Sequence, residues 1–212
     1  MQKGYTHISF VLDASSSMST IKKSTIEGVN SFLYENAKFD GKATFSLTSF
    51  DSYVKKVYDF VDIKSIEPLT ETTYITNGMT ALYDAICMEI DQTGDKLSAI
   101  PESLRPEKVL FVILTDGEEN SSKLHGKGGV QERISNQSQN FKWTFVFLGA
   151  NQDAILSASE LGINAINTMT FSAKDANVSS TYGSLTANTI MMRNGTTNTV
   201  AFSDADRAQA TQ

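Results

Sequence analysis

Three separate stretches of the chain combine carboxylates and hydroxyls at short spacing. In "DASSSM", Asp13, Ser15 and Ser17 occupy alternate positions, so a locally extended chain would direct all three side chains the same way. "GMTALYDA" contributes Thr80, and "LTDG" contributes Asp116. Oxygen ligands of this kind suit a hard divalent cation, and Mg²⁺ in particular is usually held by one or two carboxylates and several waters. The five residues are therefore candidate ligands of Mg²⁺, or of Mn²⁺ or Ca²⁺.

The charges of this set favour an anion as the final ligand. Two carboxylates cancel the charge of one divalent cation, whereas hydroxyls are weak, neutral donors. An ion held mainly by hydroxyls keeps much of its electrophilic character and attracts an anionic group from outside. The set therefore predicts a module that binds a protein partner through an Asp or Glu carboxylate, with no catalytic residue of its own.

Alternating strands and helices are expected to bring the three stretches together. Apolar runs that are almost continuous, as in strands covered on both faces, predict buried strands at residues 8–12, 43–50, 54–61, 109–114, 143–148 and 165–171. Helical periodicity predicts helices at about residues 20–37, 80–97, 130–138 and 153–161. This order predicts an α/β fold, a doubly wound sheet with helices on both faces, whose ligand crevice lies beyond the carboxyl ends of the strands.

The chain changes in character after Phe171. Ser, Thr, Asn and Ala become frequent, and Tyr182, Leu185 and Met192 share one face of a last helix that is expected to stop near Gly195. We expect a single domain over residues 1–195 and a flexible C-terminal tail over residues 196–212.

Composition restricts the partners and the setting. The net charge of −6 argues against a general binder of nucleic acid, since that affinity comes from clustered Lys and Arg. No apolar stretch is long enough to cross a membrane, and the first residues lack the apolar core of a signal peptide. One cysteine excludes an intrachain disulfide. These features predict a cytoplasmic protein, with a bacterial or phage source as one setting.

Local capping is the simpler alternative for each stretch. Ser and Asp are favoured at helix N-caps, so Asp13, Ser15 and Ser17 could cap the following helix, and Thr80 could cap the next one. Coincidence argues against this alternative, because all three stretches place oxygen groups at a strand end or a helix start. Glu118 and Glu119, close behind Asp116, are interpreted as solvated loop charges.

As a joint pattern, the D-x-S-x-S of "DASSSM", the threonine of "GMTALYDA" and the aspartate of "LTDG" resemble the metal-ion-dependent adhesion site (MIDAS) of the von Willebrand factor type A (vWA) domain family. The similarity spans about residues 6–171. It implies a Rossmann-like, mostly parallel sheet with one short antiparallel edge strand. It also implies that Ser15 and Ser17 bind the cation directly, that Thr80 does so in some ligation states, and that Asp13 and Asp116 act directly or through water.

Two residues depart from the family pattern, because Ser16 and Met79 stand where glycine is frequent. Neither removes a ligand, but Met79 is expected to change the contour around the ion and thereby the choice of partner.

Two other functions remain open from the sequence. A Mg²⁺-dependent hydrolase or phosphotransferase would use Asp13 as nucleophile, although Ser15 stands where a D-x-D arrangement would place the second carboxylate. An assembly factor would use the metal only to hold its loops together.

Overall fold

One six-stranded sheet organises the chain, of which the computed structural model describes residues 1–150 and 154–212. The strands are β1 (Gln2–Asp13), β2 (Ala43–Phe50), β3 (Val54–Asp62), β4 (Pro106–Thr115), β5 (Thr144–Ala150) and β6 (Thr168–Phe171). They lie in the order β3-β2-β1-β4-β5-β6. Only β3 runs antiparallel to its neighbour in this described sheet, because a tight turn joins it to β2. The expected mostly parallel sheet with an antiparallel edge strand is confirmed.

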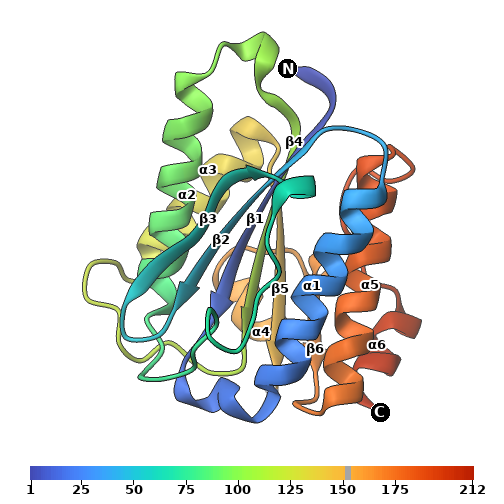
Figure 1. The fold of residues 1–212 in the computed structure, drawn as a ribbon. Coiled ribbons are helices and arrows are strands. Elements are labelled where there is room, and N and C mark those ends of the chain that lie inside the picture. Colours follow the sequence, from blue (N-terminus) through green and yellow to red (C-terminus); the bar gives the residue numbers. More distant parts are fainter. Residues whose placement is uncertain (151–153) are drawn as a thin grey trace.

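Helices cover both faces of the sheet (Figure 1). One layer holds α1 (Lys22–Lys38), α5 (Asp175–Arg193) and α6 (Asp204–Thr211), and the other holds α2 (Leu82–Ala99), α3 (Lys127–Phe141) and α4 (Ala154–Glu160). Strand β4 shows why: Leu110, Val112 and Leu114 pack toward the first layer, while Phe111 and Ile113 pack toward the second. The doubly wound α/β architecture is confirmed.

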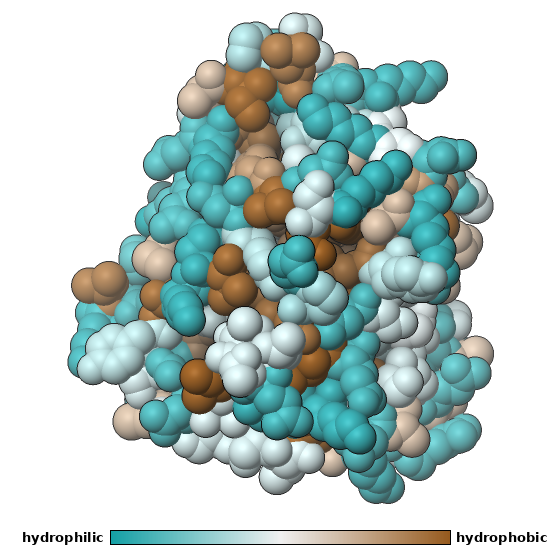
Figure 2. Space-filling view, in the orientation of Figure 1, coloured by the Kyte–Doolittle hydropathy of each residue, from teal (hydrophilic) through white to brown (hydrophobic). Residues whose placement is uncertain are grey.

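The surface of the molecule is mainly polar on the face shown in Figure 2, where apolar residues form small, separate groups. Within residues 1–150 and 154–212, no helix combines the length and the apolar character that crossing a bilayer requires.

Most predicted boundaries shift by a few residues, for example the second helix from 80–97 to Leu82–Ala99, and at two places the type of element differs as well. A 3-10 helix, Ser16–Ile21, precedes α1, so the serine cluster forms a tight turn of its own before the α-helix begins. The first residues of the strand predicted at 165–171 instead form a 3-10 helix, Ala165–Asn167, before β6. The predicted start of the fourth helix, Asp153, lies outside the described residues, and α4 is described from Ala154.

The C-terminal segment packs on the domain, so the expectation of a flexible tail over residues 196–212 is corrected. Val200, Phe202 and Ala210 are buried in the core cluster that includes α1 and α5. Hydrogen bonds tie the segment down, since Ser172 N–H donates to the Ala210 carbonyl at 2.9 Å. Helix α6 begins at a capping box made by Ser203. Composition suggested a mobile end, but a few apolar side chains at the right spacing are enough to dock it.

A buried ionic cluster holds α2 against the first three strands. Glu89 of α2 has no exposed surface and accepts hydrogen bonds from Ser9 of β1, Thr48 of β2 and, at 3.2 Å, Thr93. Lys56 of β3 pairs with the same carboxylate. A buried charge without its partner is strongly destabilising, so the position of α2 depends on this pair.

We expect Lys56→Met to lower the free energy of unfolding by about 3 kcal/mol, because it leaves the Glu89 carboxylate buried without its counter-charge. Lys55→Met is the matched control, since Lys55 is the neighbouring residue of β3 and is exposed. Urea denaturation followed by circular dichroism measures both. Equal, small losses in the two variants would contradict the role given to the pair.

Candidate metal centre

The five candidate ligands lie at the carboxyl ends of neighbouring strands. Asp13 is the last residue of β1, and Asp116 directly follows β4. These two strands pair in parallel, so their ends meet at the same edge of the sheet (Figure 1). Thr80 lies two residues before α2, in the segment that crosses this edge. The structure thus places all three sequence stretches at one edge.

Hydrogen bonds connect the hydroxyls and carboxylates directly. Ser15 Oγ lies 3.0 Å from Ser17 Oγ, and Ser17 Oγ donates to Asp116 Oδ1 at 2.6 Å. Asp13 is fully buried behind them and accepts hydrogen bonds from the Ser15 N–H at 2.7 Å and from the Thr115 hydroxyl at 2.6 Å. Asp13 therefore orients the loop that carries both serines.

The hydroxyls of Thr80 and Ser17 both lie near Gly117. A Cβ added to Gly117 would lie 3.6 Å from Thr80 Oγ1 and 3.9 Å from Ser17 Oγ. Asn120 holds the threonine there, because its side-chain oxygen accepts the Thr80 N–H at 2.8 Å and its own N–H donates to the Thr80 carbonyl at 3.0 Å. The third stretch is in this way attached to the loop that carries Asp116.

The turn between β2 and β3 supports the segment before Thr80. Gly78 has a φ of +70°, and a Cβ there would lie 2.8 Å from Ser52 Oγ, so the position requires glycine. Ser52 Oγ also accepts the Met79 N–H at 2.9 Å. The Met79 side chain is 52% exposed at this edge, which is consistent with an effect on the contour beside the candidate ligands.

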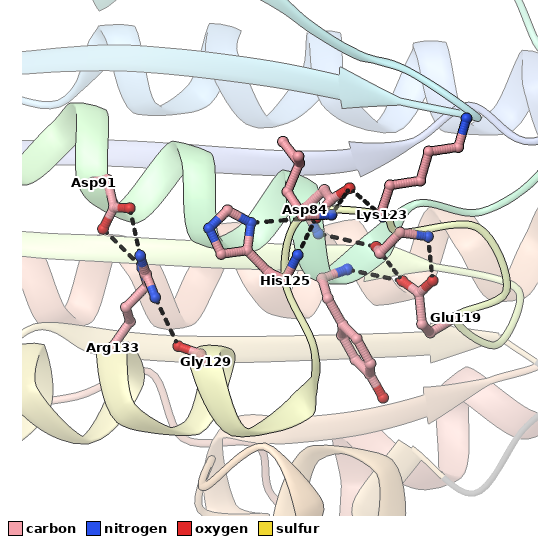
Figure 3. Close-up of polar contacts among 10 residues, drawn as sticks. Asp84, Asp91, Glu119, Lys123, His125, Gly129 and Arg133 are labelled. Carbon is pink, nitrogen blue, oxygen red and sulfur yellow. Dashed lines mark hydrogen bonds and ion pairs between the residues drawn. The ribbon is translucent and has the colours of Figure 1, made fainter.

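The loop after β4 is anchored to the first turn of α2 by Asp84 (Figure 3). The Asp84 carboxylate accepts the backbone N–H groups of Lys123 at 2.7 Å, Leu124 at 3.1 Å and His125 at 2.8 Å. Partial burial acts to raise the pKa of Asp84, but these hydrogen bonds outweigh it and hold the pKa below its ordinary 3.8. Asp84 is thus a charged anchor for the loop.

Glu119 is a second anchor, and its interpretation as a solvated charge is wrong. One carboxylate oxygen accepts the N–H groups of Ser121 at 2.8 Å and Ser122 at 2.7 Å. The other accepts the Tyr83 N–H at 2.9 Å and the Ser122 hydroxyl at 2.7 Å (Figure 3). Glu118, by contrast, is exposed. Because Tyr83 belongs to α2, Glu119 fixes the loop to the helix that follows Thr80.

Capping does not account for the hydroxyls. Ser15 is the N-cap residue of the 3-10 helix, yet its side chain makes no capping hydrogen bond. The N-cap residue of α2 is Ala81, so Thr80 does not have that role either. Asp13 does serve local structure, through its bond to the Ser15 N–H.

Both carboxylates are poorly solvated. Burial raises the pKa of Asp13 to about 6, although hydrogen bonds from Thr115 and Ser15 oppose the shift and the nearby Asp116 charge adds to it. Burial also raises the pKa of Asp116, against the hydrogen bond from Ser17. Two carboxylates destabilised by burial gain from a cation placed between them and the solvent.

Two oxygen separations at this edge are close to those of neighbouring ligands on a small octahedral cation. Bonds of 2.0–2.1 Å at right angles put neighbouring oxygen ligands about 2.9 Å apart. The Ser15–Ser17 and Ser17–Asp116 oxygen separations are 3.0 and 2.6 Å. Among the described residues, no three His, Cys, Asp or Glu side chains lie close enough together to hold a metal ion, at this edge or elsewhere. A metal centre at this edge therefore has to use hydroxyl ligands.

Sequence reasoning missed two residues that complete the centre. Thr115 is buried at the end of β4 and donates to Asp13, and Asn120 holds Thr80. Thr115 could have been identified from the sequence, because it is a hydroxyl residue at the end of an apolar strand and directly precedes the candidate ligand Asp116. Asn120 carried no comparable signal, because its partner is 40 residues away in the chain.

Comparisons with known proteins agree with this architecture at low sequence identity. No family model matches the chain, and no curated protein matches it significantly. Among solved structures, the chain is similar to proximal thread matrix protein 1 from the mussel byssus with a zinc-occupied MIDAS motif, with a TM-score of 0.60 and 16% identity over 89% of this chain and 46% of that one. It therefore spans less than half of the mussel protein.

Two bacterial structures show the same likeness. The vWF domain of the type V pilus tip protein Mfa5 from Porphyromonas gingivalis has a TM-score of 0.58 and 10% identity, over 86% of this chain and 94% of that one. A von Willebrand factor type A protein from Catenulispora acidiphila has a TM-score of 0.56 and 15% identity, over 89% of this chain and 43% of that one. The chain has the fold of a von Willebrand factor type A domain.

Proposed function

We propose that the chain is a metal-dependent protein-binding module. Ser15, Ser17, Thr80 and Asp116 would hold Mg²⁺, or Mn²⁺ or Ca²⁺, with Asp13 behind them. An Asp or Glu carboxylate of a protein partner would complete the shell of the ion. The observation that carries the proposal is the convergence of three hydroxyls and two carboxylates from separate loops at one edge of the sheet, where Ser17 Oγ lies 3.0 Å from Ser15 Oγ and 2.6 Å from Asp116 Oδ1.

The exposure of the candidate ligands supports a role in recognition. Asp13 is fully buried, Ser15 and Thr80 are nearly so, and Ser17 and Asp116 reach the surface. An ion held by this set would be anchored from inside and open on the solvent side. The occupied metal site of the mussel protein shows that a protein of this fold binds a divalent ion at its MIDAS motif, which supports a metal here.

The two alternatives fit the geometry less well. As a nucleophile, Asp13 would have to reach a substrate, but it has no exposed surface and both of its carboxylate oxygens accept hydrogen bonds. A metal that only held the loops together would add little, because hydrogen bonds of Asp84, Glu119 and Asn120 already join those loops. We therefore propose a non-catalytic module whose partner is a protein, rather than a membrane or a nucleic acid.

The metal is tested most simply by calorimetry with Mn²⁺ and Mg²⁺. We expect one site per chain, and we expect Asp116→Ala to weaken metal binding by about tenfold or more, because it removes a charge and an acceptor for metal-bound water. Asp40→Ala is the matched control, since Asp40 is exposed in the connection between α1 and β2. Equal affinity in wild type and Asp116→Ala would remove this site from consideration.

Replacing Asp13 should separate stability from metal binding. The raised pKa means that, between about pH 3.8 and 6, the folded protein keeps a proton that the unfolded chain has released. The free energy of unfolding of the metal-free protein should therefore fall by about 3 kcal/mol as the pH rises through this interval. Asp13→Asn should abolish that fall, because the Thr115 hydroxyl also lies 3.0 Å from the Gly117 carbonyl and can donate there instead.

Denaturation at pH 4 and pH 8, with and without Mg²⁺, measures both effects of Asp13→Asn. Without metal the variant should be the more stable protein at pH 8 and equal to wild type at pH 4. Mg²⁺ at about 100 times its dissociation constant should stabilise wild type by roughly 2.7 kcal/mol and the variant much less. A metal-free variant that is less stable than wild type at pH 8 would show that the buried charge is not destabilising.

Thr80 should matter more to partner binding than to metal binding. Its hydroxyl faces the same point as Ser17 from another loop, so its loss leaves the charged ligands in place but alters the geometry offered to an incoming carboxylate. We expect Thr80→Ala to weaken capture of a Mg²⁺-dependent partner from cell extract more than it weakens metal affinity, whereas Ser15→Ala/Ser17→Ala should lose both. Capture that is unchanged in Thr80→Ala and in EDTA would place the binding surface elsewhere.

A further inference from the structure

A pocket of about 320 Å³ adjoins the candidate metal centre. It lies between the first turn of α2, the loop after β4, and α4. Gly117 is one of its lining residues, and a Cβ added to this glycine would lie 3.6 Å from Thr80 Oγ1 and 3.9 Å from Ser17 Oγ. The volume is at the lower limit of ligand pockets, which suits one or two side chains rather than a large cofactor.

The floor of the pocket is apolar. Leu82, Phe147 and Leu161 line it and are 5%, 1% and 3% exposed, so they also belong to the core on this side of the sheet. Leu156 of α4 lines it as well and is 58% exposed. An aliphatic chain laid along this floor would be removed from water on one side.

The rim of the pocket is acidic. Glu118, Glu119 and Glu160 line it, with Lys127 as the one basic residue among the lining residues. Lys127 pairs with Glu160 at 2.7 Å, which leaves two acidic side chains without a basic partner in the described part of the chain. The Glu119 carboxylate faces backbone N–H groups and a hydroxyl, whereas Glu118 is exposed to solvent. Glu118 is therefore the acid that an incoming group would meet.

We propose that this pocket receives a Lys or Arg side chain of the same protein partner whose carboxylate completes the metal shell; the inference rests on the proposed function. The aliphatic stem of such a side chain packs on Leu82 and Phe147, and its cationic end reaches Glu118. An acidic side chain would be repelled by Glu118 and Glu119, and a wholly apolar one would take water from the Glu118 carboxylate without replacing its hydrogen bonds. The partner motif is thus an acidic residue close to a basic one.

The pocket can be tested without a known partner, by NMR of the ¹⁵N-labelled full chain titrated with N-acetyl-arginine amide. N-acetyl-citrulline amide, which has nearly the same shape without the charge, is the matched probe. We expect the arginine probe to shift the amide signals of Tyr83, Gly117 and Glu118. The citrulline probe should bind about three- to fivefold more weakly to the wild-type chain. The arginine probe should bind to the Glu118→Gln variant more weakly by the same factor of about three to five. Glu102→Gln, which changes an exposed acid of the 3-10 helix before β4, should leave binding unchanged.

Equal binding of the two probes, no shift at these amides, or an unaltered response in Glu118→Gln would overturn the inference. Acetate, titrated in Mg²⁺ and in EDTA, reports separately on the metal through the amides of Ser15 and Thr80. If acetate acts only in Mg²⁺ and the arginine probe fails, the pocket inference alone is overturned. If the arginine probe binds but acetate has no Mg²⁺-dependent effect, the link between the pocket and a metal-bound carboxylate is overturned together with the proposed metal.

Discussion

The hydrogen bond from Thr115 to Asp13 joins the ends of the two central strands, and the arrangement of the candidate metal centre depends on it. It exists because β1 and β4 pair in parallel and end together. Its acceptor is a carboxylate taken out of water, and the same carboxylate turns the chain at Ser15. The two loops that leave these strands therefore start from a common point, and the Ser17 hydroxyl of one loop donates to Asp116 of the other.

A buried charge at this point has a cost that the rest of the fold offsets. Burial alone would favour a neutral Asp13, as its raised pKa indicates. The stability comes from other places, above all from the two apolar layers that cover the sheet. Destabilised charge at a functional edge, supported by a rigid sheet, is what a site made to attract a cation requires. The same edge places a pocket with an apolar floor and an acidic rim next to the candidate metal centre.

Much of the fold could be predicted from the sequence because its signals are local. Apolar runs identify strands directly, and the predicted strand at residues 43–50 has the bounds of β2. The parallel order follows from helices between strands, and it brought Asp13, Thr80 and Asp116 to one edge. The docking of residues 200–210 could not be predicted from composition, because three buried apolar residues decide it. The anchoring by Asp84 and Glu119 was also out of reach, since their partners are backbone N–H groups, which carry no sequence signal.

The central claim is that one divalent cation binds between the loops after β1 and β4 and the segment before α2. Paramagnetic broadening by sub-stoichiometric Mn²⁺ in ¹⁵N NMR spectra locates a bound ion residue by residue. Our account predicts that the amide signals of Ser15, Ser17, Thr80 and Asp116 broaden first, and that EDTA restores them. Broadening centred on other acidic residues, such as Asp91 of α2, or spread evenly over the acidic surface, would contradict it.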